Sequence, residues 1–373
     1  MTEIIMGRLD KIREAMAEKK IDALLVLVEE NRRYLSGFTG EDHHFDESAG
    51  ALLITAKEQI LTTDSRFELQ AVREAPLYEV TIYRNGLAKE LVGLTDRFNI
   101  RRLGFESTRV SVQQHDSIQQ EFAGAGRSVD MVPLETFVEN LRQIKTPAEI
   151  QQTQKALELA EDVFRHVAKM LKPGMSEKNV AWEMEKGMRQ AGADSLSFPV
   201  IIAAGPNSAL PHAIPTEREI NLGEPILFDW GAKLNGYCSD TSRTVTLGPP
   251  DEMFLKVYQT VLEAQQKAIT VIQSGASSRA VDAIARDHIR QQGYEGKFGH
   301  GLGHGTGLAV HEAPRLSPLK EVTLESGMIV TVEPGVYLPE WGGIRIENQV
   351  VVGDRGAQVL NRLSTTYDIG KID

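Results

Sequence analysis

The sequence has little cysteine and no excess of basic residues. Cys238 is the only cysteine among 373 residues, so no disulfide can form within the chain. A single thiol fits the reducing environment of the cytoplasm. The net charge is −11, and Lys and Arg form no run, whereas a surface that binds nucleic acid needs a basic patch. These absences predict a cytoplasmic protein that does not bind nucleic acid.

Long apolar stretches are also absent. An uncharged stretch at residues 195–216 is interrupted by proline and serine, so it does not predict a helix that spans a membrane. The first ten residues lack the apolar core of a signal peptide. We therefore expect no membrane association.

Hydrophobic residues nevertheless make up 41% of the chain, which is enough for ordinary globular cores. The first part of the chain alternates a helical pattern with apolar, strand-like stretches. The predicted helix covers residues 7–19, and the predicted strands lie at residues 21–28, 51–55, 60–63, 78–83 and 102–105. This alternation predicts an α/β domain over residues 1–143.

A second domain is expected over residues 144–373. Thr146 and Pro147 are typical of the cap and first position of a helix. The predicted helices of this domain cover residues 148–170, 177–191, 252–272 and 279–292. The intervening stretches are rich in glycine and strand-like, so we expect an α+β domain of helices and hairpins.

A faint internal repeat marks two acidic residues. In residues 223–231 and again in residues 327–335, a glycine is followed by five residues, an acid, one residue and another glycine. The repeat places Asp229 and Glu333 at the ends of apolar strands. A buried acid is costly unless something neutralises its charge.

A second acid follows each copy, Asp240 after the first and Glu347 after the second. Turns at Gly236 and at Gly342–Gly343 would bring each second acid beside the first. Four crowded carboxylates repel one another, so some stay protonated unless cations are present. Two divalent ions would cancel the four charges, which predicts a dinuclear metal site. Unrelated hairpins with structural ion pairs are the alternative.

Glycine occupies every odd position from 299 to 307, and His300 and His304 lie between these glycines. Five alternating glycines disfavour a helix. As a strand, the segment would have one face without side chains and another that carries both imidazoles. A glycine-rich loop with incidental histidines is an equally good interpretation of this segment alone.

Together these motifs resemble metallopeptidase family M24. The resemblance covers residues 145–373 and rests on five short motifs: Phe-Asp229-Trp-Gly, Ser-Asp240-Thr-Ser-Arg-Thr, Gly-His304-Gly-Thr-Gly-Leu, Val-Glu333-Pro-Gly-Val and Gly-Ile-Arg-Ile-Glu347. It implies the pita-bread fold with its pseudo-twofold repeat, and a metal site held by the five numbered residues. Residues 34–40 and 63–66 resemble, more loosely, the creatinase-type N-terminal domain, which points to the Xaa-Pro-specific branch of the family.

The resemblance also implies residues on the substrate side. His212 and His311 would bind the scissile carbonyl and the oxyanion, and Glu333 would relay a proton from the attacking water. Arg315 would pair with a product carboxylate. Three further residues match the proline pocket of relatives: His300, Tyr337 and Arg345. Structural roles stay open for several of them, including strand packing for Tyr337 and neutralisation of Glu347 by Arg345.

The resemblance implies a peptidase that needs two divalent cations and a peptide with proline at its second position. We expect an Xaa-Pro aminopeptidase first and an Xaa-Pro dipeptidase (prolidase) as the alternative. One imidazole among four carboxylates is an oxygen-rich set that suits Mn²⁺ and accepts Co²⁺, Zn²⁺ or Fe²⁺. Relatives are commonly dimers, so a homodimer is expected.

Two remote alternatives are a metal-free, creatinase-like amidinohydrolase and a non-catalytic binding module. Both would be expected to lack ligands, whereas all five ligand positions are filled here. His43 and His44 lie in a charged loop, which we interpret as solvated, with access to a partner subunit's site as a weaker possibility.

Overall fold

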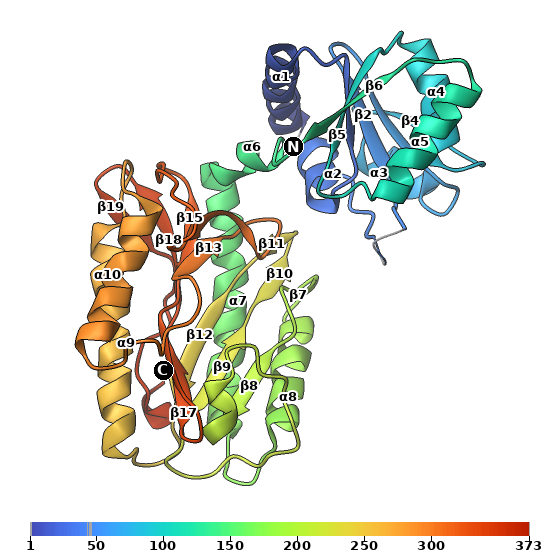
Figure 1. The fold of residues 1–373 in the computed structure, drawn as a ribbon. Coiled ribbons are helices and arrows are strands. Elements are labelled where there is room, and N and C mark those ends of the chain that lie inside the picture. The colour runs from blue at the N-terminus through green and yellow to red at the C-terminus, as the bar shows by residue number, and fades with distance from the viewer. Residues whose placement is uncertain (1, 43, 45–46, 373) are drawn as a thin grey trace. The chain divides into compact units, whose positions relative to one another are not determined.

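The computed structural model describes residues 2–42, 44 and 47–372. It divides into two compact units, one that ends at Arg142 and one that begins at Gln143 (Figure 1). Each unit contains its own cluster of buried apolar side chains. Among the helices that the structure describes, none is long and apolar enough to cross a membrane.

The N-terminal unit is built on a six-stranded sheet in the order β4-β3-β2-β1-β5-β6. Its strands are β1 (Ala23–Val26), β2 (Ala51–Thr55), β3 (Gln59–Thr63), β4 (Glu79–Ile82), β5 (Arg102–Glu106) and β6 (Asp130–Leu134). The helices are α1 (Thr2–Lys19), α2 (Glu29–Ser36), α3 (Glu68–Glu74), α4 (Leu87–Arg97) and α5 (Val112–Gly124), and α6 (Glu139–Gln143) follows. Strand β1 lies inside the sheet and is buried along its whole length, as its unbroken apolar sequence predicts.

The alternation of helices and strands predicted for this unit is confirmed. Leu9, Ile12 and Met16 form the buried face of α1, in agreement with the helical spacing of the sequence. Strand β6 is absent from the sequence prediction because it begins with a charged residue and contains Pro133, and both features are unusual in a strand.

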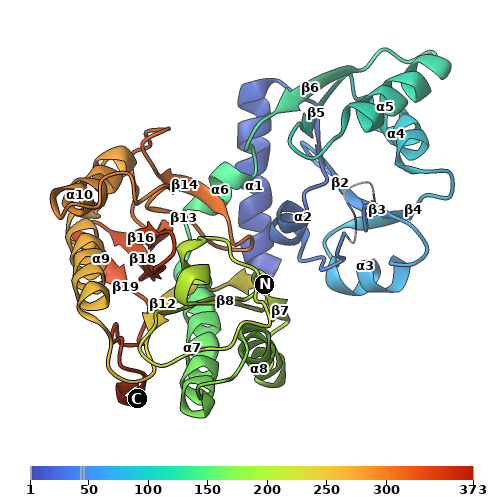
Figure 2. The same cartoon turned by 60° about the horizontal axis from the view of Figure 1, so that its bottom comes forward.

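The C-terminal unit consists of two halves, each of which begins with two helices and continues with strands. The first half contains α7 (Pro147–Met170), α8 (Glu177–Gln190), β7 (Ser195–Leu196), β8 (Ile201–Ala204), η1 (Gly205–Ala209), β9 (Ile226–Trp230), β10 (Ala232–Leu234), β11 (Tyr237–Cys238) and β12 (Thr241–Val245). The second half contains α9 (Glu252–Val271), α10 (Ser278–Gln291), β13 (Gly303–Gly305), β14 (Glu312–Leu316), β15 (Ile329–Val332), β16 (Gly335–Leu338), β17 (Gly342–Arg345), β18 (Asn348–Gly353) and β19 (Gly356–Val359), and η2 (Ile369–Lys371) ends the described chain. Figure 2 shows α7 and α8 of the first half and α9 and α10 of the second.

Local sequence signals explain where these helices begin and how they pack. Thr146 and Glu149 form a capping box at the start of α7, as predicted from the Thr-Pro pair. Phe164 of α7 stacks on Trp230 of β9 with ring centroids 4.5 Å apart. Since side chains alternate along a strand, Phe228 also faces Phe164, and Asp229 between them faces away from the helix.

The two halves meet along β12 and the segment that precedes β18. Glu347 donates its backbone N–H to the carbonyl of Ser242 at 3.0 Å. Thr244 and Arg345 exchange two hydrogen bonds of 3.0 Å through the threonine hydroxyl. One backbone bond and two bonds of a threonine hydroxyl therefore fix the acids of one half relative to those of the other.

Candidate metal centre

Each half brings two acids to the same end of an antiparallel strand pair. In the first half, Asp229 lies in β9 and Asp240 immediately precedes its partner β12. In the second half, Glu333 immediately follows β15 and Glu347 immediately precedes its partner β18. The predicted repeat thus corresponds to two equivalent strand pairs.

The connections within these pairs differ from the sequence prediction. A short hairpin intervenes in each half, β10–β11 in the first and β16–β17 in the second. Gly236 lies in the turn of the first hairpin, as expected, but Gly342 and Gly343 belong to strand β17. Only close approach explains a glycine at position 343, because a β-carbon there would collide with the Ser208 backbone.

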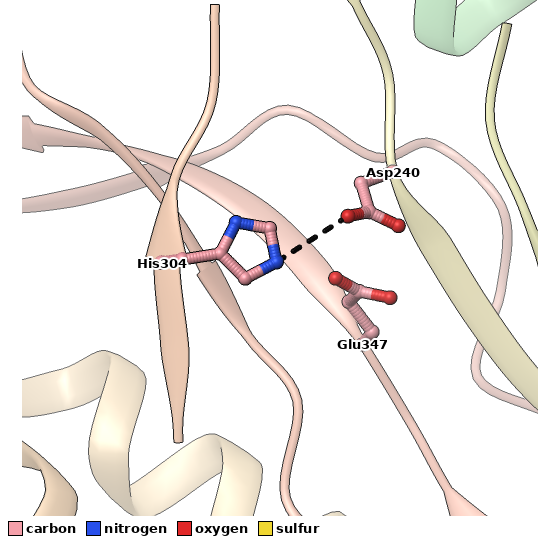
Figure 3. Close-up of side chains that lie close together, drawn as sticks. All are labelled: Asp240, His304 and Glu347. Atoms are coloured by element: carbon pink, nitrogen blue, oxygen red, sulfur yellow. Dashed lines mark ion pairs between the residues drawn. The ribbon is translucent and has the colours of Figure 1, made fainter. Parts of the chain in front are cut away.

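His304 joins the acids from strand β13. Ligand atoms of Asp240, His304 and Glu347 all lie within 4.8 Å of one another, and Figure 3 shows the three side chains pointing toward a common centre. Nε2 of His304 is 3.5 Å from Oδ2 of Asp240 and 3.3 Å from Oε1 of Glu333. The structure therefore brings together residues that are up to 107 positions apart in the chain.

The cluster is electrostatically unsatisfied. Burial, followed by the charge of Glu347, raises the pKa of Asp240 well above its usual range. Burial and the charge of Glu333 do the same to the pKa of Glu347, and burial raises the pKa of Glu333 to about 7. Burial, aided by His311, lowers the pKa of His304 to about 3. The imidazole is therefore neutral at pH 7 and has a nitrogen lone pair available for a cation.

The donor set fits divalent cations. Two buried oxygens, Oδ1 of Asp229 and Oε1 of Glu347, accept no hydrogen bond from any residue that the structure describes. Buried polar atoms are normally satisfied, so orphaned carboxylate oxygens point to an ion. Carboxylates with one neutral imidazole are ligands for Mn²⁺ and related metals. The predicted roles of the five residues as ligands stay a prediction.

Arg345 lies at the side of this cluster, where it contacts Asp229 rather than Glu347, the acid that the sequence suggested as its partner. Its Nη2 is 2.6 Å from Oδ2 of Asp229, and its Nε donates to Oγ of Ser242 at 2.9 Å. Ser242 in turn donates to Oε2 of Glu347 at 2.9 Å. Arg345 thus pairs directly with Asp229 and reaches Glu347 only through a hydroxyl group.

The residues predicted for the proline pocket form a chain of hydrogen bonds. Nε2 of His300 lies 2.9 Å from the Tyr337 hydroxyl, which accepts a bond of 2.8 Å from Nη1 of Arg345. Burial, followed by the charge of Arg345, lowers the pKa of His300 to about 4. The sequence left residues 299–308 open between a strand and a loop; only Gly303–Gly305 form a strand, and His300 lies outside it.

The other predicted substrate residues surround His304. The rings of His304 and His311 have centroids 4.4 Å apart, and Arg315 lies opposite His304 in the β13–β14 register. His212 is exposed on the segment that follows η1, and its charge would influence both His300 and His311. These residues therefore lie around one centre, and their roles stay predictions.

Two sequence features have no role in this arrangement. Cys238 is buried, and its Sγ lies 3.6 Å from the Leu308 carbonyl. His44 is exposed, and His43 lies outside the described residues.

Sequence reasoning missed Gln265, a buried residue of α9. Its Nε2 donates to the carbonyl of Val332 at 3.0 Å and to the carbonyl of Ile346 at 2.9 Å. These carbonyls immediately precede Glu333 and Glu347, so one amide holds the backbone beside both acids. The available signal was a glutamine on the buried face of an amphipathic helix, where a polar side chain needs a partner.

Gln265→Leu is expected to weaken metal binding about 10- to 100-fold, the usual effect of losing a residue that orients ligands. The two freed carbonyls should also reduce the free energy of unfolding by about 1–3 kcal/mol. Calorimetric titration of the metal-free protein with Mn²⁺ measures the first effect. Gln259→Leu is the matched control, because Gln259 is exposed on the same helix and bonds only Glu263 among the contacts described.

Known proteins share both units of this chain. Residues 151–354 match metallopeptidase family M24, and residues 8–144 match the creatinase/prolidase N-terminal domain. These matches, together with the similar structures below, confirm the predicted fold class: an α/β N-terminal domain followed by a pita-bread domain with an internal repeat.

Three relatives cover nearly the whole chain. An Xaa-Pro dipeptidase from Bacillus anthracis is 37% identical with a TM-score of 0.90, covering 98% of this chain and 99% of that chain. An X-Pro aminopeptidase from Thermotoga maritima is 33% identical with a TM-score of 0.85, and the match covers 94% of this chain and 98% of that chain. An Xaa-Pro dipeptidase from Pyrococcus furiosus is 33% identical over 355 residues, which are 95% of this chain and 97% of the relative.

Proposed function

Since the chain belongs to metallopeptidase family M24 and is therefore a peptidase, we propose that it is an Xaa-Pro dipeptidase that uses two divalent cations. The observation that carries the proposal is the convergence of four carboxylates and one neutral imidazole, with Asp240 and Glu347 buried and Asp229 and Glu333 partly buried. Two of the carboxylate oxygens have no partner among the described residues. A metal-free hydrolase or a binding module gives no reason to keep so costly a cluster.

The choice of a dipeptidase reverses the order of the two activities expected from the sequence. Relatives of 37% and 33% identity that cover nearly the whole chain are Xaa-Pro dipeptidases, which favours the alternative over the aminopeptidase. Arg315 supports the same choice, because it lies opposite His304 in the β13–β14 register and so stands near the centre. A dipeptide with proline in second position presents its free carboxylate within one residue of the scissile bond, where such a guanidinium can pair with it.

In this proposal, five residues hold the cations: Asp229, Asp240, His304, Glu333 and Glu347. The cations, when bound, supply the charge that neutralises the carboxylates and the Lewis acidity that makes water a competent nucleophile at neutral pH. The oxygen-rich set favours Mn²⁺ as the metal.

The side chains around the cluster would transfer the proton and stabilise the developing negative charge. Glu333 would accept a proton from the attacking water and pass it to the leaving proline nitrogen; the hydroxyl of Thr331 orients this carboxylate with a hydrogen bond of 3.1 Å. Partial loss of hydration and the nearby Arg315 lower the pKa of His311, so His311 is neutral at pH 7. It and His212 would each donate an N–H to the scissile carbonyl as negative charge develops on its oxygen.

The proline ring would lie against His300 and Tyr337. Tyr337 is buried, and Arg345 fixes its hydroxyl, so the pocket wall is rigid before substrate binds. Preorganisation of this kind lowers the entropic cost of orienting a substrate.

The proposal also includes a homodimer located in the cytoplasm. Light scattering coupled to size-exclusion chromatography tests the oligomeric state.

One assay tests the proposed activity. Mn²⁺-loaded protein is incubated with an Xaa-Pro dipeptide, the same dipeptide amidated at its C-terminus, and an Xaa-Pro-Yaa tripeptide. We expect cleavage of the dipeptide and little of the other two. Faster cleavage of the tripeptide would make the protein an aminopeptidase, and cleavage of none of them with any of the four metals would reject an Xaa-Pro peptidase.

Arg315→Met is expected to lower kcat/KM for the dipeptide about 10- to 100-fold, since a hydrogen bond to a charged group contributes about 1.5–3 kcal/mol. The residual rate for the amidated dipeptide should not change, because that substrate has no carboxylate to lose. An equal loss for both substrates would show that Arg315 does not recognise the carboxylate.

A further inference from the structure

The segment that carries His212 is fastened at both ends to one buried carboxylate. The segment runs from Gly205, the first residue of η1, to Thr216. Glu177, the first residue of α8, has no exposed surface. It belongs to neither the proposed metal set nor the proposed substrate set, so its burial needs another explanation.

The two oxygens of Glu177 hold opposite ends of the segment. Oε1 accepts the backbone N–H of Ala204, the residue just before the segment, at 2.8 Å and the Asn207 amide at 3.0 Å; the same amide also lies 3.1 Å from Oε2. Oε2 accepts the backbone N–H of Thr216 at 2.9 Å and its hydroxyl at 2.6 Å. Every donor is a neutral group, and the position at the first turn of α8 adds the favourable field of a helix N-terminus.

Contacts from the metal centre fix the middle of the same segment. Nη1 of Arg345 donates to the carbonyl of Pro211, next to His212, at 3.2 Å. The backbone N–H of Gly343 donates to the Ser208 hydroxyl at 2.8 Å. Glu177 therefore holds the ends, and the centre itself holds the part next to His212. An exposed histidine on such a segment can keep a fixed position only if its backbone does.

We infer that Glu177 is a positioning residue, which acts through the 205–216 segment to keep the His212 imidazole over the metal centre. This inference rests on the role proposed for His212 in Xaa-Pro hydrolysis. A residue that merely stabilised the fold would affect all steps of the reaction and all parts of the domain alike. A positioning residue acts on one segment and, through it, on one imidazole.

Glu177→Gln is the sharpest test, because the amide has the shape of the acid but only one accepting oxygen. Its NH₂ group must face either the Ala204 N–H or the Thr216 N–H, so one end of the segment loses its acceptor. We expect kcat/KM for the dipeptide to fall roughly 10- to 100-fold, the effect of misplacing a catalytic group by about an ångström, with most of the loss in kcat.

Glu183→Gln provides the matched control. Glu183 lies on the same helix and pairs with Lys186 at 3.1 Å, and no contact described for it reaches the 205–216 segment. The same change of acid to amide there should leave kcat and KM within about twofold of the unchanged protein, since partly exposed ion pairs within a helix contribute little.

A double-mutant cycle separates positioning from general destabilisation. If Glu177 acts through His212, then adding Glu177→Gln to His212→Ala should lower kcat/KM by less than about twofold, because the imidazole is already gone. A full additional 10- to 100-fold loss would overturn the inference. Thr216→Val keeps the backbone bond of residue 216 to Glu177 but removes the 2.6 Å bond of the hydroxyl, together with the acceptor for the Arg218 N–H and the Asn207 amide. It gives a milder second variant if Glu177→Gln fails to fold, and it should show the same non-additivity.

Hydrogen exchange gives a readout that does not depend on activity. Glu177→Gln should accelerate amide exchange within residues 205–216 while α7 and α9 keep the rates of the unchanged protein. Uniform acceleration across the domain, or no change in the segment, would contradict the inference. If the unchanged protein proves inactive on Xaa-Pro substrates, the proposed function fails, whereas the exchange result still decides whether Glu177 fastens the segment.

Discussion

Glu347→Gln is expected to abolish peptide hydrolysis and, at the same time, to make the metal-free protein more stable at neutral pH. Glu347 is one of the five residues proposed to hold the cations, so its loss should reduce turnover by on the order of 10³-fold or more. The gain in stability follows because the amide keeps an acceptor for Ser242 but carries no charge among the other acids.

The direction of the pH dependence follows from the raised pKa values of Asp240 and Glu347. When a carboxyl has a higher pKa in the folded chain than in the unfolded chain, the folded state binds more protons above the unfolded pKa. The metal-free protein should therefore lose stability as the pH rises from about 4 through the raised pKa values. Each unit by which a pKa is raised corresponds to about 1.4 kcal/mol.

Calorimetric unfolding in the presence of a chelator at pH 5 and pH 8 measures this effect. We expect Glu347→Gln to raise Tm at pH 8 and to raise it less at pH 5, because the raised pKa of Glu347 leaves the carboxyl more protonated at the lower pH. Glu325→Gln is the control, since Glu325 is exposed. A lower Tm for Glu347→Gln at pH 8 would mean that the metal-free acids are not in electrostatic conflict.

Arg345→Met is expected to destabilise the metal-free protein by about 3–5 kcal/mol at pH 8, the usual effect of leaving a buried charge without its partner. Asp229 loses the bond of 2.6 Å, and Tyr337 and Pro211 lose donors as well. Saturating Mn²⁺ should recover part of the loss, because cations then neutralise Asp229.

Denaturant titration with and without Mn²⁺ measures both parts of this prediction. Arg345→Lys is the informative comparison, because it keeps the positive charge but cannot make four directed contacts. We expect its free energy of unfolding to lie between those of Arg345→Met and the unchanged protein. If lysine is as damaging as methionine, geometry matters more than charge at this position.

The acids of the centre were predictable because apolar strands do not normally end in a buried acid. Apolar strands that end in Asp229 or Glu333 are unusual, and two such strands with a second acid after each are hard to explain without cations. The structure confirms the two strand pairs, although each contains a hairpin that the sequence prediction lacked. The apolar sequence of each strand predicted where the acids lie, but it did not predict the hairpins that connect the strands.

The sequence predicted that the alternating glycines leave one face without side chains, but it did not predict how short the strand would be. A β-carbon at Gly303 would collide with the Thr331 backbone, and one at Gly305 would collide with the Ala313 backbone, so close approach does explain the bare face. The strand itself is only three residues long because its neighbours β14 and β15 pair with that part alone.

The roles of Gln265, Glu177 and the side chain of Arg345 could not be read from the sequence. Each depends on a partner at least 27 residues away, and no local pattern specifies which distant backbone group a polar side chain meets. Sequence reasoning finds the groups that carry chemistry more readily than those that hold them, because only the former cluster in recognisable motifs.

The cluster takes Asp229 and Asp240 from one half of the C-terminal domain and His304, Glu333 and Glu347 from the other. Cations bound there would cross-link the two halves, in the way that a disulfide joins two segments.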